Sequence, residues 1–274
     1  SRWLLSRLNR LVKSTQYLFD TYQYGEAGRQ MRSFLWDEFA PWYLEISKHP
    51  LYNGTDEEKA IARRVLVHTL QTCMRLLHPY MPFVTEEIWS YLPVEDEALM
   101  LAQWPTADES YIDDAAEARM DVLMDLVRSV RDIRNNQYNI NPGKKLTAIV
   151  QPGRHRADLE TYGYIFARLC NVEAIELLAD DAPAPDEAAS AVVADTALYL
   201  PLRGMIDIAA ECERLHKERE NLAEQIRRTE GMLANEGFVN NAPEAVVQRE
   251  RNKLSELQSS TAQIEERIAE LCAD

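Results

Sequence analysis

The residue types that most often carry catalysis or hold metals are scattered along this sequence of 274 residues. No Cys-x-x-Cys pair is present, so a structural zinc site is not expected. The sequence also contains no glycine-rich phosphate loop and no Gly-x-Ser-x-Gly elbow. It therefore predicts no catalytic residue and no metal site, and it favours a binding module over an enzyme. The histidines stand without ligand spacing at positions 49, 68, 78, 155 and 216, and the cysteines stand at 73, 170, 212 and 272.

Two of the cysteines, Cys73 and Cys212, lie on apolar faces of predicted helices. Unpaired cysteines on such faces behave as small buried hydrophobic residues, so we expect free thiols at both positions. Free thiols are typical of a reducing compartment, and we expect the protein to be cytoplasmic. No apolar run approaches the roughly 20 residues that a membrane-spanning helix needs, so no membrane partner is expected.

Positively charged side chains are the remaining candidates for a chemical role. Arg7, Arg10 and Lys13 lie on one side of a predicted helix, opposite its apolar face. They could face nucleic-acid phosphates, or they could form a solvated face with surface salt bridges, and the sequence leaves both possibilities open. The same two interpretations, contact with phosphates or a solvated surface, apply to Lys144 and Lys145 in a predicted turn. The net charge of −15 means that any site for a polyanion must be a local patch.

Residues 1–110 are predicted to form an all-α domain, a bundle of four or more helices. Amphipathic helices are indicated over 2–24 and 57–78, each with an apolar stripe at helical spacing. The segment 34–43 between them is unusually aromatic, and we expect most of its rings to lie in the core.

Residues 111–202 are predicted to form a connector made of one helix and a small α/β unit. The helix covers about 114–135 and is followed by a turn. A second helix is indicated over 155–169. Short strands are predicted at 146–150, 172–178, 191–194 and 197–202.

Residues 203–274 are predicted to form an antiparallel coiled-coil hairpin, which makes the whole chain mainly α. Apolar residues recur every 3.5 positions on average over 208–233 and again over 247–271. Between the two runs we expect Gly237 to take the left-handed conformation after the first helix, and Pro243 to suit the start of the second. A coiled coil between two chains would not need this interruption, so the sequence favours a hairpin within one chain.

Motifs spread along the chain resemble a known family. Residues 2–9, 36–45 and 77–89 read RWLLSRLN, WDEFAPWYLE and LHPYMPFVTEEIW. They are similar to the anticodon-binding helical domain of class I aminoacyl-tRNA synthetases for branched aliphatic amino acids. Residues 200–207 and 235–247 resemble the C-terminal coiled coil of the valyl-tRNA synthetase family, and the isoleucine and leucine enzymes do not end this way.

The resemblance implies that a full enzyme of this family activates valine with ATP and Mg²⁺ and esterifies tRNA(Val). The His-x-Gly-His and Lys-Met-Ser-Lys-Ser type motifs of its active site, and its editing domain, do not occur in this sequence. We therefore expect a monomeric C-terminal portion, inactive alone and without a cofactor of its own. Its expected partners are tRNA(Val) and the missing catalytic domain of the same chain.

The resemblance also implies RNA contacts at a few positions. Leu44 and Glu45 lie where the family approaches the anticodon. Near the hairpin tip, Arg228 and Arg249 or Arg251 lie where the arm of the family meets the outer corner of the tRNA, where a guanidinium can pair with phosphate or stack on bases. The weaker candidates, added from charge geometry, are Arg7, Arg10, Lys13, Lys144 and Lys145.

Two alternatives stay open at this point. Each of these cations could form an ordinary surface salt bridge instead of contacting RNA. The chain as a whole could be a non-catalytic structural or interaction protein that uses its coiled coil without binding RNA.

Overall fold

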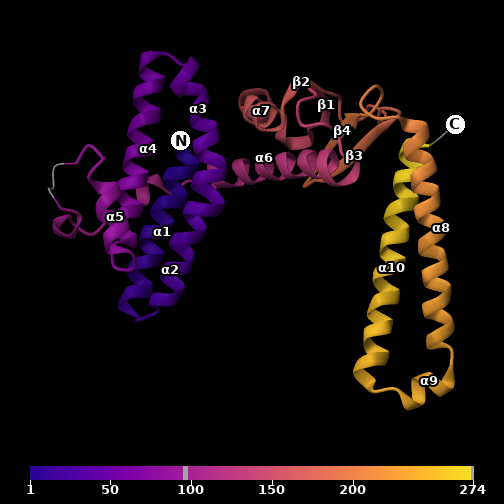
Figure 1. Ribbon diagram of the computed structural model, residues 1–274. Helices are drawn as coiled ribbons and strands as arrows, with labels where there is room; N and C mark the ends of the chain where they lie inside the picture. The colour runs from indigo at the N-terminus through magenta and orange to yellow at the C-terminus, as the bar shows by residue number, and fades with distance from the viewer. Residues whose placement is uncertain (95–97, 273–274) are drawn as a thin grey trace. The chain divides into compact units, whose positions relative to one another are not determined.

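The computed structural model describes residues 1–94 and 98–272. The chain divides into two compact units, Ser1–Met124 and Asp125–Asp274. Helices dominate both units, and a small four-stranded sheet lies in the second (Figure 1). This confirms the predicted fold class, a mainly α protein with a small α/β part.

The first unit is a bundle of helices. Its first helix lies at the centre, because Leu4 and Leu8 on its apolar stripe are completely buried and the helix contacts both the second and the fourth. Trp89, on the last helix of the bundle, is one of the largest buried side chains of the protein. These helices are α1 (Arg2–Asp20), α2 (Tyr24–Ser33), α3 (Leu44–Asn53), α4 (Asp56–Leu77) and α5 (Pro82–Trp89).

The aromatic segment Phe34–Tyr43 is a π-helical stretch that joins α2 to α3. Pro41 lies inside it and has no N–H to donate to the preceding turn, which is consistent with a widened helix at this point. Phe34, Phe39, Trp42 and Tyr43 are buried, as predicted for most of these rings, whereas Trp36 is 67% exposed. The buried rings fix the position at which α3 begins.

A cluster of polar side chains attaches the start of α6 (Asp114–Asp132) to α1. We call it the Glu117 cluster, and it consists of Ser6, Arg7, Arg10 and Glu117. Glu117 accepts hydrogen bonds from the Ser6 hydroxyl and from Arg10 Nε, the latter at 2.7 Å, and Arg7 lies 3.5 Å away. Ser6 is fully buried and also accepts a hydrogen bond from the Asp113 N–H. Two elements more than 100 residues apart in the sequence are thus joined through one carboxylate.

The second unit contains a mixed sheet with the strand order β2-β1-β4-β3. β1 and β2 are parallel and are connected by α7, whereas β4 is antiparallel to both β1 and β3. The predicted strands and the predicted helix between them are confirmed. Their bounds are β1 (Leu146–Gln151), α7 (Arg156–Cys170), β2 (Val172–Leu177), β3 (Ala188–Val193) and β4 (Thr196–Pro201).

Arg134 holds the turn that leads into β1. It is 5% exposed, and its guanidinium donates to the carbonyl oxygens of Cys170 at 2.6 Å and Asn141 at 3.0 Å. Further bonds go to the carbonyls of Pro142 and Lys144. Burial lowers the pKa of Arg134 from its usual value, and all four acceptors of its hydrogen bonds are neutral backbone carbonyls. The turn is therefore fixed by one buried cation.

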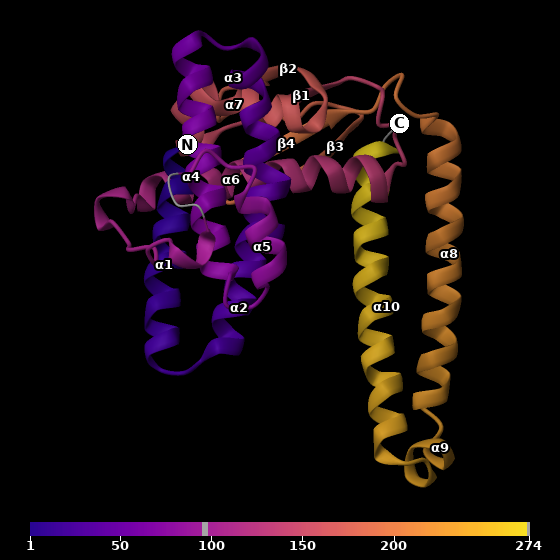
Figure 2. The same cartoon turned by 60° about the vertical axis from the view of Figure 1, so that its left-hand side comes forward.

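Two long helices, α8 (Ile208–Leu233) and α10 (Glu244–Leu271), form a hairpin within the second unit (Figures 1 and 2). Each predicted apolar run lies within one helix, and the two helices contact each other and run side by side (Figure 1). Leu215, Val247 and Ile264 are buried between them. The predicted hairpin within one chain is confirmed.

The tip of the hairpin differs from the prediction. Gly237 does not take the left-handed conformation, because it lies inside a short helix, α9 (Glu236–Asn241). The side chain of Asn235 caps α9 by accepting hydrogen bonds from the N–H groups of Gly237 and Phe238 at 2.9 and 3.3 Å. Pro243 is the residue immediately before α10, where its missing N–H costs no hydrogen bond.

The prediction of a free thiol at Cys212 is wrong. Cys212 forms a disulfide with Cys272, 60 residues later, with 5.9 Å between the two Cα atoms. The apolar face of α8 points toward α10, and the hairpin brings the end of α10 back beside the start of α8. Because the two cysteines are far apart in the sequence, no local pattern indicated that they lie close together in the fold. Cys73 is buried and free, as expected, and so is Cys170.

Replacing Glu117 with Gln should destabilise the first unit by about 1–2 kcal/mol, because a neutral amide weakens the hydrogen bonds from Ser6 and Arg10. All tryptophans lie in the first unit, at 3, 36, 42, 89 and 104, so their fluorescence during urea unfolding reports on this unit. Glu109→Gln is the matched control, because Glu109 pairs with Lys13 on the surface and both side chains are more than half exposed. Equal midpoints for the two variants would contradict the role of Glu117.

The stabilisation by Glu117 should depend on pH. Burial alone would raise the pKa of Glu117, but the hydrogen bonds from Ser6 and Arg10 and the charges of both arginines lower it below its usual value. The contribution is therefore complete above the unfolded value of about 4.3 and is lost as the pH falls through the lower folded value. The difference between the native protein and Glu117→Gln should be present at pH 7 and shrink at about pH 3. A difference that does not change with pH would contradict the assignment.

Candidate nucleic-acid interface

The predicted cations of α1 are paired with carboxylates. Arg7 makes a bidentate contact with Glu38, at 2.7 Å from Nε and 2.6 Å from Nη2. Arg10 contacts Glu117 and Asp114, and Lys13 contacts Glu109. The hydrogen bond to Glu38 raises the pKa of Arg7 from its usual value, and burial opposes this increase.

These pairs show why the face carries so many cations. The acids come from the π-helical segment, from the start of α6 and, for Glu109, from the short 3-10 turn before α6, so this side of α1 meets carboxylates from elsewhere in the fold. RNA would compete with these carboxylates for the same guanidinium groups. Contact of Arg7, Arg10 and Lys13 with RNA stays a prediction.

Leu44 and Glu45 lie at the beginning of α3, directly after the π-helical segment. Leu44 is 37% exposed, and the Glu45 carboxylate accepts from Lys48 Nζ at 2.6 and 2.8 Å on the surface of the helix. An exposed apolar side chain beside a carboxylate can contact the face of an unstacked base and accept a hydrogen bond from its amino group. The buried rings of Trp42 and Tyr43 precede this pair directly. Contact of Leu44 and Glu45 with RNA stays a prediction.

Lys144 and Lys145 have different surroundings. The ammonium group of Lys144 donates to the carbonyl oxygens of Gly204 and Met205, both at 3.2 Å, so it ties the turn to the segment before α8. Lys145 is exposed and makes no ion pair with any described residue. Of the two, Lys145 is the side chain that is available to a phosphate, on a turn that Arg134 makes rigid.

The arm, which we define as α8, α9 and α10, presents the predicted arginines on its surface. Arg228 is 73% exposed and pairs with Glu224 on the same helix. Arg249 and Arg251 are exposed on α10, and neither forms an ion pair within the described ranges. Exposed pairs of this kind contribute little to stability, so the three arginines are available for other contacts.

A groove of about 500 Å³ runs between α8 and α10 at Arg228. Lys253 of α10 lines it together with Arg228, so the hairpin brings one cation from each helix to the same groove. Two cations with neighbouring amide groups can hold a phosphate and hydrogen-bond to a ribose or a base edge. Its lining residues are Asn221, Glu224, Gln225, Arg228, Thr229, Met232 and Lys253.

Sequence reasoning missed Lys253, Asn221 and Gln225 as members of this site. The signal was present in the apolar repeats, because aligning the two runs around the tip places the region of Lys253 opposite that of Arg228. Charge alone gave no reason to prefer Lys253 over the other cations of an acidic arm.

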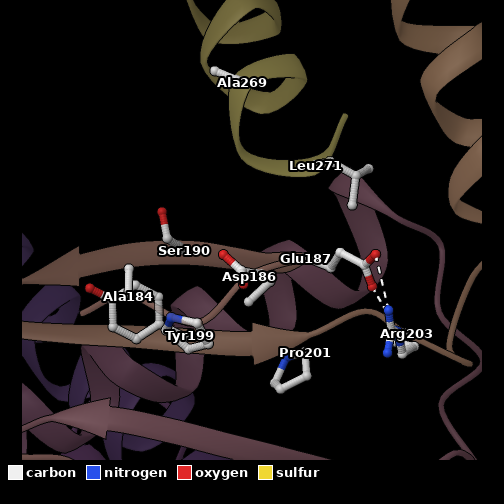
Figure 3. Close-up of a pocket in the computed structure, with 11 residues that line it drawn as sticks. Ala184, Asp186, Glu187, Ser190, Tyr199, Pro201, Arg203, Ala269 and Leu271 are labelled. Atoms are coloured by element: carbon white, nitrogen blue, oxygen red, sulfur yellow. Dashed lines mark hydrogen bonds and ion pairs between the residues drawn. The ribbon is translucent and has the colours of Figure 1, made fainter. Parts of the chain in front are cut away.

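A larger cavity of about 900 Å³ lies between β3, β4, the loop before β3 and the end of α10 (Figure 3). Its cation, Arg203, is already paired with Glu187, with 2.9 Å between Arg203 Nε and Glu187 Oε2. Asp186 adds a further negative charge, as Figure 3 shows. The predicted RNA-binding residues are not among those that line it, and its charge does not suit a phosphate.

Metal binding and membrane insertion are two other roles that the described residues could serve. Groups of three or more His, Cys, Asp or Glu side chains placed to hold a metal are not found among them. None of their helices is both long and apolar enough to cross a membrane.

Comparison with known proteins gives matches along most of the chain. Residues 1–150 match the anticodon-binding domain of tRNA ligases, and residues 207–272 match the tRNA binding arm of valyl tRNA synthetases. The valine--tRNA ligase of Enterococcus faecalis is 41% identical over 276 residues, and that of Listeria monocytogenes is 39% identical over 272 residues. The Bacillus subtilis enzyme is 37% identical.

Each alignment covers 98% of this chain but 31% of the relative, so the chain spans less than a third of the length of these curated relatives. The anticodon-binding match alone includes more than half of the residues. The helical hairpin matches the tRNA binding arm of valyl tRNA synthetases, and the chain belongs to the anticodon-binding family of tRNA ligases.

Proposed function

We propose that this chain is the part of a valine--tRNA ligase that recognises tRNA(Val). The first unit binds the anticodon stem-loop through the beginning of α3, and the arm binds the outer corner of the same tRNA through the groove at Arg228. The observation that carries the proposal is the presence of an anticodon-binding domain and a tRNA-binding arm in one chain. The valine--tRNA ligases that align with 98% of the chain support the choice of valine.

The distribution of charge limits how the RNA can be held. The net charge is −15, and the arm contains more acids than bases, so bulk attraction to the phosphate backbone is unfavourable. Affinity must come from a few placed groups: Arg228, Lys253, Arg249 and Arg251 on the arm, and Lys145 on its turn. Leu44 and Glu45 supply base contacts without adding positive charge. Such a surface disfavours non-specific polyanions and leaves specificity to geometry.

Aminoacylation with ATP and Mg²⁺ belongs, in this proposal, to a catalytic domain of the same polypeptide in the cytoplasm. This portion acts there by positioning the tRNA, and the ligase is a monomer. The hairpin supports the monomer, because α8 buries its apolar face against α10 of its own chain. The rival proposal of a coiled coil between chains has no comparable support, since the seam is already occupied.

The chain should bind tRNA(Val) more tightly than a tRNA with another anticodon, and both affinities should fall as salt increases. A chain that uses about four phosphate contacts should show a slope of log K against log salt of roughly −3 to −4. Fluorescence anisotropy with labelled transcripts gives both the affinities and their salt dependence. The titrations should run from about 50 to 300 mM KCl, a range around physiological ionic strength. Absence of binding to either tRNA at the lowest salt would reject the RNA function for this chain.

Arg228→Glu should weaken tRNA(Val) binding at least about tenfold, because it removes one phosphate contact and adds a repulsive charge to the groove. Lys217→Glu is the matched control. It makes the same kind of charge reversal on α8, at an exposed lysine paired with Glu213 and outside the groove. Circular dichroism of both variants checks that helicity is retained. Equal losses in the two variants would mean that general charge, not the groove, determines affinity.

A further inference from the structure

The base of the arm is where its two helices meet the rest of the second unit. Arg267 on α10 donates to the Gln137 carbonyl at 2.8 Å and to Glu211 at 3.2 Å. Its guanidinium also lies 4.8 Å from the centre of the Tyr138 ring. The end of α10 contacts β3. These contacts attach α10 to the rest of the second unit, and the Arg267–Glu211 contact also joins it to α8.

The Cys212–Cys272 disulfide closes the hairpin at the same end. Cys212 lies in the second turn of α8, and Cys272 is the residue that follows α10. The bond therefore encloses nearly the whole arm in a covalent loop, with a sequence separation of 60 residues. A cross-link that encloses a long loop removes many unfolded conformations, so this position has a large effect on the order of the arm.

The four cysteines differ in how accessible they are. Cys73 and Cys170 are 2% and 4% exposed, and burial raises the pKa of both thiols to about 12. A thiol with so high a pKa forms almost no thiolate at neutral pH, and the thiolate is the form that reacts with disulfides. Cys212 and Cys272 are only half-buried, so small thiols and disulfides can reach them. Thiol–disulfide exchange with small molecules is therefore expected only at the pair Cys212 and Cys272.

We propose that Cys212 and Cys272 form a reversible redox modification site that controls the order of the arm and, through it, the affinity for tRNA. The link to tRNA rests on the proposed function. In the disulfide form the base of the hairpin is clamped, and both cations of the groove are held in register. In the dithiol form α8 can separate from α10 at its first turns, and RNA binding must then restore that order.

The oxidant is a small disulfide of the glutathione class. The thiolate of one cysteine attacks this disulfide, forms a mixed disulfide and releases one small thiol. The thiolate of the second cysteine then attacks the protein sulfur of the mixed disulfide, which forms the Cys212–Cys272 bond and releases the second small thiol. Two protein thiols lose two electrons and two protons, and one small disulfide is reduced to two thiols. A small thiol in excess reverses the exchange.

The whole chain should be equilibrated with oxidised or reduced glutathione, alkylated, and digested without reduction. Mass spectrometry should find the peptides of Cys212 and Cys272 joined in the oxidised sample and separately alkylated in the reduced one. Cys73 and Cys170 should be in the free thiol form in both. Hydrogen exchange in residues 208–215 and 264–271 should be at least about tenfold slower in the oxidised protein.

Anisotropy with labelled tRNA(Val) completes the test, and the oxidised protein should bind several-fold more tightly than the reduced one. Cys212→Ser and Cys272→Ser are the controls, because each should show the reduced behaviour under both conditions. Failure to form the cross-link, or equal hydrogen exchange in the two forms, would overturn the proposal. Equal tRNA affinity of the two forms would overturn its functional part. Absence of tRNA binding in both forms would instead reject the proposed function, and the exchange rates would still decide whether the clamp orders the arm.

Discussion

The structure of the arm depends on one constraint, which is that two helices share a single interface with no third layer over it. Each apolar side chain in the seam has partners on one side only, and so the interior of the arm is narrow. Leu215, Val247 and Ile264 are buried, but most of the other residues of α8 and α10 are exposed or half-buried. Two helices packed in this way can form a long arm from a simple repeating pattern. Their narrow interface, however, contributes little to the free energy of unfolding. The order of the arm must therefore be supported at its ends.

The distribution of charged side chains is also constrained. The chain is strongly acidic, yet its proposed partner is a polyanion, and its cations have different roles in the structure. Arg7 and Arg10 neutralise acids from two other segments and hold the first unit together. Arg134 is buried among carbonyl groups, and Arg267 fastens the base of the arm. Arg249 and Arg251 on the arm and Lys145 on the turn before β1 are exposed and form no ion pair with a described residue, so they are candidates for contact with RNA.

Patterns that repeat within a segment were predictable from the sequence, whereas contacts between distant segments were not. The 3.5-residue repeats predicted the hairpin, and alternation predicted the strands of the second unit. The Cys212–Cys272 bond and the pairing of Arg10 with Glu117 both join residues that no local pattern connects. The prediction at the tip was wrong, because Gly237 was expected to follow a helix end in the left-handed conformation. Instead, Asn235 caps a new short helix that contains Gly237. Lys253 was missed for the same reason as the disulfide, since its neighbour lies on the other helix.

The polar positions of the seam explain why its ends matter so much. The Thr229 and Thr261 hydroxyls donate to carbonyl groups of their own helices, at 3.0 and 2.9 Å. Glu250, whose side chain points inward, is 4.0 Å from Lys253 on the same helix. Buried polar groups fix the register of two helices when they find partners across the interface. Here the two threonine hydroxyls bond within their own helices, and Glu250 Oε2 has no hydrogen-bond partner among the described residues. The register is therefore set by the Asn235-capped turn at the tip and by the contacts of Arg267 and Cys272 at the base. Because Arg228 and Lys253 line the same groove only in one register of the two helices, the shape of the candidate RNA site is determined at the tip and the base of the arm, by residues outside the groove itself.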